Sequence, residues 1–283
     1  RAPEKRIRRP QGSGVRLTTS FADRTPSVTS AVAESDTTRM LSGVPGLALP
    51  TPDAAASGPF LGRRNNGWEI ALVLGVSLGQ SAVYSILSLL EKLTRPVPIG
   101  QQTTSMNNSV VPDRPWLDLA YQIAGIVFPM VPALLALYLL RLTGDRAGIG
   151  FDLRRPGFDL SRGLLAAAVI GIPGLAFYYA ARFVGINTDV QPANLAANWW
   201  TIPAYVGLAV MNGVLEEVVM LAYLFTRLGQ LGWRAWQFVA FSAVVRGAYH
   251  LYQGFGGGLG NLVMGLVFGL LYLRWRRVGP LVV

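Results

Sequence analysis

The sequence predicts an all-α protein, a polytopic bundle of transmembrane helices. Apolar residues make up 51% of the chain and charged residues only 14%, against about 25% charged residues in soluble domains. The mean hydropathy is positive. Aromatic residues stand at the ends of the apolar stretches, as they do at the two interfaces of a bilayer. Together these observations predict a membrane protein with about six helices.

The first part of the chain differs from the rest. Residues 1–65 are rich in Ser, Thr, Pro, Ala and Arg and show no sustained period, which is typical of a solvated, disordered arm. This part has no apolar core like that of a signal peptide, so the first membrane helix is expected to act as an uncleaved anchor. We predict a basic cytoplasmic tail over 1–65 and a transmembrane helical domain over 66–283. Because the chain opens on Arg1, we also expect a processed or partial product.

Apolar stretches long enough to cross about 30 Å of hydrocarbon follow the tail. The last two are the shortest. The predicted helices cover 68–90, 116–140, 164–184, 202–225, 236–252 and 259–273. A segment that mixes Phe and Leu with Asp and Arg, 150–162, is expected to lie in the cytoplasmic interface.

Arginines gather in every second connection between these stretches. Since positive residues mark the cytoplasmic side, this pattern predicts a cytoplasmic amino terminus. Lys92, Arg95 and Arg114 are exceptions in the first opposite loop. The arginines that carry the prediction are Arg63, Arg64, Arg141, Arg146, Arg154, Arg155, Arg162, Arg227, Arg234, Arg274, Arg276 and Arg277. The net charge of +10 therefore reflects topology, and no nucleic-acid partner is expected.

An acidic pair interrupts the fourth apolar stretch. A charged carboxylate at mid-bilayer depth costs about 2.5 to 3.5 kcal/mol, so Glu216 and Glu217 together oppose insertion unless they are paired, protonated or wetted. His250, the single histidine, lies near the end of the next stretch, and Arg246 precedes it by one helical turn. Asn212 lies one turn before Glu216, where it either orients that carboxylate or makes an interhelical amide bond. Ionisable residues at this depth predict a functional site.

Depth along the helices indicates which of these residues can meet. Glu217 lies about 15 Å above the turn between the fourth and fifth helices, and Arg246 about 17 Å above it. We therefore predict an ion pair between Arg246 and Glu217. His250 is expected about one turn nearer the outer face.

The segments 212–224 and 246–250 resemble the CAAX protease and bacteriocin-processing (CPBP) family of intramembrane endopeptidases. Its first two motifs are a Glu-Glu doublet followed by Arg, and Phe-x-x-x-His. The similarity covers about 149–283. Two motif positions diverge, because Leu221 replaces the arginine and Arg246 replaces the phenylalanine. The cation has thus moved from one helix to the next.

This resemblance implies an endopeptidase of the cell membrane that cleaves CAAX-like or bacteriocin-like peptides, in a bacterial source. The resemblance makes Glu216, Glu217 and His250 the expected catalytic residues, with Arg246 and Asn212 in support. Glu216 corresponds to the general base and His250 to its partner, which together activate water for attack on the scissile carbonyl. A later helix with His-x-x-x-Asn or Asp completes the site in the family. The chain has one histidine, so we expect a C-terminally truncated form whose activity depends on the missing final helix. The implied partners are a peptide or protein substrate and the lipid bilayer.

Two alternatives stay open at this point. The same fold also suits a non-catalytic scaffold or immunity protein, and a proton-coupled transporter is a more distant reading. No cofactor is expected, although a divalent metal such as zinc and a metalloprotease-like mechanism stay open. One histidine and two adjacent glutamates fall short of the usual three zinc ligands.

Glycines in the last apolar stretch carry predictions about packing. The GxxxG step at Gly265 and Gly269 predicts a closely packed neighbouring helix. The run 254–260 is expected to form a flexible outer turn, and Asn261 a helix cap or packing residue.

Overall fold

The computed structural model describes residues 63–283, so the predicted tail over 1–65 lies almost wholly outside the described residues. In this part the helices are joined by irregular loops, and the two three-residue strands, β1 (Thr103–Ser105) and β2 (Asp189–Gln191), pair in parallel. The predicted all-α class is confirmed. The helices are α2 (Arg63–Gly75), α3 (Leu78–Thr94), α4 (Pro115–Leu142), α5 (Pro156–Phe183), α6 (Thr201–Glu217), α7 (Leu224–Gln230), α8 (Ala235–Tyr249), α9 (Phe255–Trp275) and α10 (Gly279–Val282). A π-helix, η4 (Val218–Tyr223), joins α6 to α7, and the short 3-10 helices are η2 (Ile99–Gln101), η3 (Asp145–Ile149) and η5 (Leu251–Gln253).

Membrane-length helices account for most of the described chain. Between residues 63 and 283, four helices are long and apolar enough to cross a bilayer, namely α4, α5, the continuous run Thr201–Gln230 and α9. The bent pair α2 and α3 gives a fifth span if it is counted as one. Large apolar side chains such as Phe128 and Ile172 point outward from these helices, as lipid-facing residues do. The chain is a multi-pass membrane protein.

The predicted first helix is broken rather than straight. The axes of Asn66–Gly75 and Leu78–Thr94 differ by 49°. At the break the Ser77 hydroxyl donates a hydrogen bond to the Val73 carbonyl. A Cβ on Gly79 would lie 2.6 Å from the Leu74 carbonyl oxygen, so this bend requires glycine there. The fifth predicted helix is also shorter than expected, because α8 has 15 residues and ends at Tyr249.

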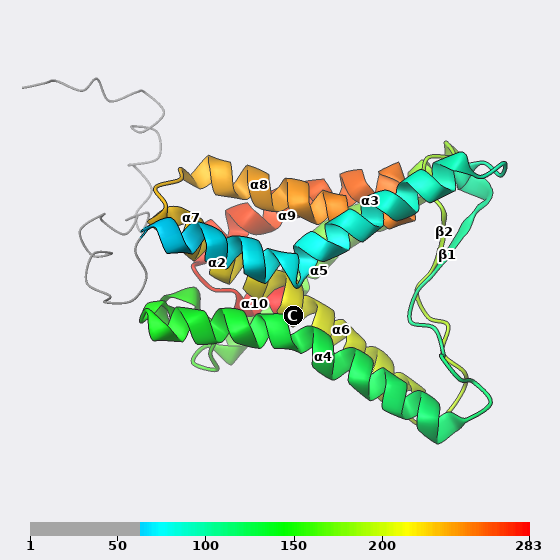
Figure 1. Cartoon of the computed structure of the whole chain (residues 1–283), viewed down its shortest axis with the longest axis horizontal. Helices are drawn as coiled ribbons and strands as arrows, with labels where there is room; N and C mark the ends of the chain where they lie inside the picture. Colours follow the sequence, from blue (N-terminus) through cyan, green and yellow to red (C-terminus); the bar gives the residue numbers. More distant parts are fainter. Residues whose placement is uncertain (1–62) are drawn as a thin grey trace, which may run out of the picture. The chain divides into compact units, whose positions relative to one another are not determined.

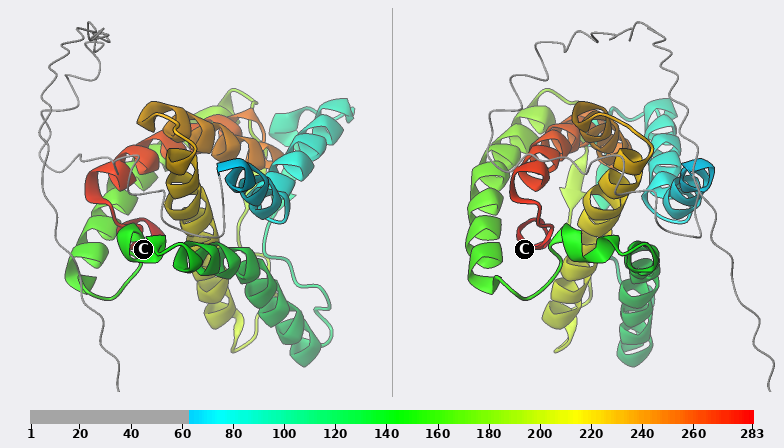
Figure 2. Two further views of the ribbon diagram at one scale, coloured as in Figure 1. Left: turned by 60° about the vertical axis from the view of Figure 1, so that its left-hand side comes forward. Right: turned by 90° about the vertical axis from the view of Figure 1, so that its left-hand side faces the viewer.

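The central element is the continuous run of α6, η4 and α7. In its apolar window 72% of residues are buried, compared with 11% in α5. Figure 1 shows α4 beside α6, and α8 and α9 side by side with α3 along α8. The turned views of Figure 2 show α5 next to α9, and α10 lies against both α5 and α6. The fourth predicted helix, which bears the acidic pair, therefore forms the core of the described bundle.

Glycines bring α8 and α9 together. A Cβ on Gly265 would lie 2.8 Å from the Ala243 Cα, and one on Gly247 would lie 2.8 Å from the Gly258 carbonyl oxygen. The predicted close approach at Gly265 is confirmed. The expected flexible turn over 254–260 is wrong, because α9 begins at Phe255 and takes up most of this run. These glycines are needed for contact between helices.

Hydrogen bonds and ion pairs join the connection between α4 and α5 to the segment after α9. The expected interfacial segment 150–162 is only half irregular, because α5 begins at Pro156. Arg277 donates hydrogen bonds to both carboxylate oxygens of Asp159, at 2.8 and 2.7 Å, and to Asp152 Oδ1 at 3.1 Å. The hydrogen bonds to Asp159 raise the pKa of the Arg277 guanidinium above its ordinary value. These contacts of Arg277 with Asp152 and Asp159 hold α10 against α5.

Candidate functional site

The acidic pair stands where the helix changes type. Glu216 and Glu217 are the last residues of α6, and the π-helix Val218–Tyr223 begins directly after them. π-Helical turns are rare and often occur at functional sites. All six residues of η4 are at most 1% exposed. Neither Gly nor Pro lies in this segment, so the sequence carries no breaker that could have predicted it.

Glu217 forms a sealed ion pair with Arg246. The Arg246 Nη2 atom donates a hydrogen bond to Glu217 Oε1, and the two residues are 1% and 3% exposed. The guanidinium carbon lies 5.2 Å from the centroid of the Phe268 ring. Within residues 63–283, Glu217 Oε2 is buried without a hydrogen-bond partner. The ion pair predicted from helix depth is confirmed.

Glu216 has a different environment. Its side chain is 20% exposed. The Oε2 atom accepts a hydrogen bond from the Tyr249 hydroxyl at 3.0 Å and lies 3.6 Å from Arg246 Nη1. Adjacent residues on a helix point about 100° apart. This explains why Glu217 hydrogen-bonds to the Arg246 guanidinium, whereas Glu216 lies farther from it. The doublet therefore consists of one closed and one accessible carboxylate.

His250 caps the carboxyl end of α8. Its Nδ1 atom lies 3.0 Å from the Arg246 carbonyl oxygen, and since a carbonyl only accepts, Nδ1 carries the proton. The centroid of the imidazole lies 4.6 Å from that of the Tyr249 ring. Among the described residues His250 has no hydrogen bond to either glutamate. Tyr249 connects the two, because its hydroxyl contacts Glu216 and its ring contacts His250.

Other residues singled out in the sequence lie outside this cluster. Asn212 is exposed, and its amide has no hydrogen bond within the described part of the chain. Leu221, at the motif arginine position, is buried in η4. Asn261 is not a helix cap, because its amide donates to the Gly257 carbonyl inside α9.

A second buried cluster surrounds Arg227. Expected as a loop charge, Arg227 is instead fully buried, with Nε 2.6 Å from Glu69 Oε1 and Nη1 3.1 Å from Asp145 Oδ2. The Tyr223 hydroxyl also donates to Glu69 Oε1, at 3.0 Å. These contacts join α2, η3 and α7. The sequence contained a signal for this pairing, since Glu69 at the start of the first predicted helix and Arg227 just after the fourth lie on the same predicted side of the membrane.

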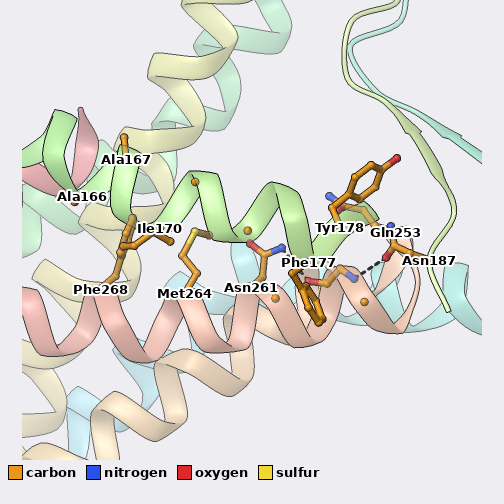
Figure 3. A pocket seen from close by; sticks show the side chains of 15 residues that line it. Ala166, Ala167, Ile170, Phe177, Tyr178, Asn187, Gln253, Asn261, Met264 and Phe268 are labelled. Carbon is orange, nitrogen blue, oxygen red and sulfur yellow. Dashed lines mark hydrogen bonds between the residues drawn. The ribbon is translucent and has the colours of Figure 1, made fainter. Parts of the chain in front are cut away.

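A groove of about 460 Å³ lies between α5 and α9. Figure 3 shows side chains from both helices around it, including Ile170, Phe177, Met264 and Phe268. This groove lies between the third and sixth predicted helices. Phe268 lines it and also stacks on Arg246. One ring therefore lies between the groove and the Arg246 ion pair.

The acidic and histidine side chains of residues 63–283 are not arranged to hold a metal ion. Between residues 63 and 283 no group of three or more His, Asp or Glu side chains is arranged to hold one. The metalloprotease-like mechanism considered from the sequence therefore has no support in this part of the chain.

The arrangement defines a multi-pass helical membrane protein with a buried carboxylate site beside a histidine. Residues 198–283 match the family model described as type II CAAX prenyl endopeptidase Rce1-like. No curated protein and no solved structure matches the chain. The match begins within the predicted 149–283 region and includes Glu216, Glu217 and His250. The predicted resemblance to the CPBP membrane proteases is thus confirmed.

Proposed function

We propose that this protein is an intramembrane endopeptidase of the CAAX type, in which Glu216 is the general base. The observation that carries the proposal is the contrast within the doublet, in the region that matches the family. Glu217 is closed off by Arg246, whereas Glu216 keeps an accessible side chain beside the histidine. A carboxylate that is held in place but open on one side suits proton transfer from water.

The proposed reaction begins with a water molecule between Glu216 and His250. Glu216 Oε1 has no hydrogen-bond partner among residues 63–283, so it is available to take the proton. His250 Nε2 is the unprotonated nitrogen of the neutral ring and accepts a hydrogen bond from the same water. The water oxygen bonds to the scissile carbonyl carbon, the carbon–nitrogen bond breaks, and Glu216 passes its proton to the leaving amine. Such general acid–base catalysis contributes about 10² to 10⁴-fold.

The substrates that fit this proposal are CAAX-like or bacteriocin-like peptides, reached from within the bilayer. We propose that the protein lies in the cell membrane with its amino terminus in the cytoplasm, because arginines gather in every second connection between the apolar stretches. The α6–η4 segment and the end of α8 supply the residues that act on water, Glu216 and His250.

The direct test is cleavage by membranes that contain Glu216→Gln or His250→Ala. The probe is an internally quenched, farnesylated CAAX peptide. Each variant is expected to lower cleavage by about 100-fold or more while membrane abundance stays unchanged. Glu91→Gln is the matched control, because Glu91 is an exposed glutamate paired with Arg95 far along α3. If both variants lose abundance while cleavage per folded molecule is unchanged, the catalytic assignment is wrong.

A non-catalytic scaffold or immunity protein is the second candidate. One observation favours it, since the Glu217–Arg246 pair is complete without His250, and His250 makes no direct contact with a carboxylate in the described residues. This candidate predicts that the cell tolerates Glu216→Gln as long as the ion pair is intact.

A further inference from the structure

The Tyr249 side chain contacts both proposed catalytic groups. It is 5% exposed, and its hydroxyl donates to Glu216 Oε2 at 3.0 Å. Its ring lies against the His250 imidazole, with 4.6 Å between the centroids. Neither the depth argument nor the motif resemblance pointed to this residue.

The two oxygens of Glu216 are unequal because of this contact. Oε2 is engaged by the Tyr249 hydroxyl and lies 3.6 Å from Arg246 Nη1. Oε1 has no partner in residues 63–283. A carboxylate at the end of a flexible side chain samples several rotamers, and ordering it costs conformational entropy. Two contacts to the same oxygen restrict the carboxylate to one orientation.

We infer that Tyr249 is a positioning residue for Glu216. This inference rests on the proposed function. The Tyr249 hydroxyl holds Oε2 of Glu216 so that Oε1 faces the water, and the Tyr249 ring sets the spacing between that carboxylate and His250. Preorganisation of this kind lowers the barrier to reaction because the geometry is fixed before the substrate arrives. Tyr249 itself takes no proton in this scheme.

The test is Tyr249→Phe, which keeps the ring against His250 and removes only the hydroxyl. With the farnesylated CAAX peptide, kcat is expected to fall about 10- to 100-fold, the range for a hydrogen bond to a charged group, while KM is unchanged. Tyr223→Phe is the matched control, because its buried hydroxyl also donates to a carboxylate at 3.0 Å, that of Glu69. The control is expected to change membrane abundance but not kcat.

A second measurement does not depend on cleavage. A hydrophobic carbodiimide modifies accessible carboxyl groups, and mass spectrometry measures the modification of Glu216, with Glu216→Gln as the blank. Loss of the phenol frees Oε2, so modification is expected to rise about 10-fold in Tyr249→Phe and to stay unchanged in Tyr223→Phe. If the wild-type protein cleaves no peptide but this rise occurs, the peptidase proposal fails and the positioning of Glu216 by Tyr249 holds.

Two results would overturn the inference. The first is unchanged modification together with an unchanged kcat in Tyr249→Phe. The second is unchanged modification with a loss of activity that lies in KM or in abundance alone, which would make Tyr249 a packing residue.

Discussion

At the scale of single residues, two neighbouring glutamates have opposite environments. Glu217 is sealed with Arg246, and Glu216 stays accessible beside Tyr249. A lone guanidinium at this depth costs about 3 kcal/mol, so the pair removes a penalty that each partner would carry alone. Leu221, at the motif arginine position, is compatible with the fold because Arg246 supplies the cation from the next helix.

This arrangement predicts the effect of changing Arg246. Arg246→Leu leaves Glu217 buried and unpaired, which is expected to destabilise the protein by about 3 to 5 kcal/mol and remove it from the membrane. Arg246→Lys keeps the charge and is expected to be partly tolerated. Membrane abundance of the two variants, measured side by side, checks this, and an abundance unaffected by the leucine change would refute the ion pair.

The residue contacts could be predicted only in part. The Arg246–Glu217 pair follows from counting residues along two helices, because both run from the same turn. Asn212 shares a helix face with Glu216 by its spacing, yet it is exposed. The spacing of residues along one helix does not show whether a neighbouring helix covers all of that face. The contact between Tyr249 and Glu216 depends on where α8 ends. No residue in the sequence of α8 predicted that end.

At the scale of elements, the apolar stretches predicted the helices but not their irregularities. The long apolar runs correspond to α4, α5, the α6–α7 run and α9. The bend at Ser77 and the π-helix η4 arise from local backbone hydrogen bonding and packing, which composition and hydropathy do not reveal. These irregularities lie beside polar residues, as departures from ideal helices often do at functional sites.

Packing between α8 and α9 provides a test at this scale. Gly265→Ala places a Cβ 2.8 Å from the Ala243 Cα, which forces the helices apart. The expected cost is about 1 to 3 kcal/mol, seen as a lower melting temperature in detergent. Gly125→Ala is the control, because a Cβ there meets nothing within 4 Å and the helix is expected to gain stability slightly. Equal melting temperatures for both variants would contradict the packing described.

At the scale of the whole described molecule, three arginines join segments that are distant in sequence. Arg227 joins α2, η3 and α7, and Arg246 joins α8 to α6. Arg277 joins the end of the chain to the connection before α5 and to α5 itself. Arg227 and Arg277 were expected only as topological charges. Their place at the ends of the helices could be predicted from the sequence, whereas their ion pairs depend on partners that only the folded chain brings close.

The Arg277 contacts predict a dependence on pH. The Arg154 amide, followed by Arg277, lowers the pKa of Asp152 below its ordinary value of 3.8. Because the folded-state pKa is the lower one, the contribution of Asp152 to stability is complete above pH 3.8 and is lost as the pH falls through the lowered value. Hydrogen exchange of the Val278 and Gly279 amides, corrected for the intrinsic rate, is expected to lose protection in that window.

A control locates that effect. The amide of Leu231, which donates to the Arg227 carbonyl, lies in the turn between α7 and α8 and is expected to keep its protection. Asp152→Asn is expected to remove the pH dependence at Val278 and Gly279. If protection there is independent of pH in the unmodified protein, the acidic side chains do not fasten this segment.

The central claim is that the two adjacent glutamates have different roles, and one paired measurement tests it most directly. Cleavage of the farnesylated CAAX peptide and membrane abundance are measured together for Glu216→Gln and Glu217→Gln. We predict that Glu216→Gln keeps its abundance and loses cleavage, whereas Glu217→Gln loses abundance because Arg246 is left without its partner. Equal abundance of the two variants, or equal cleavage per folded molecule, would contradict the claim.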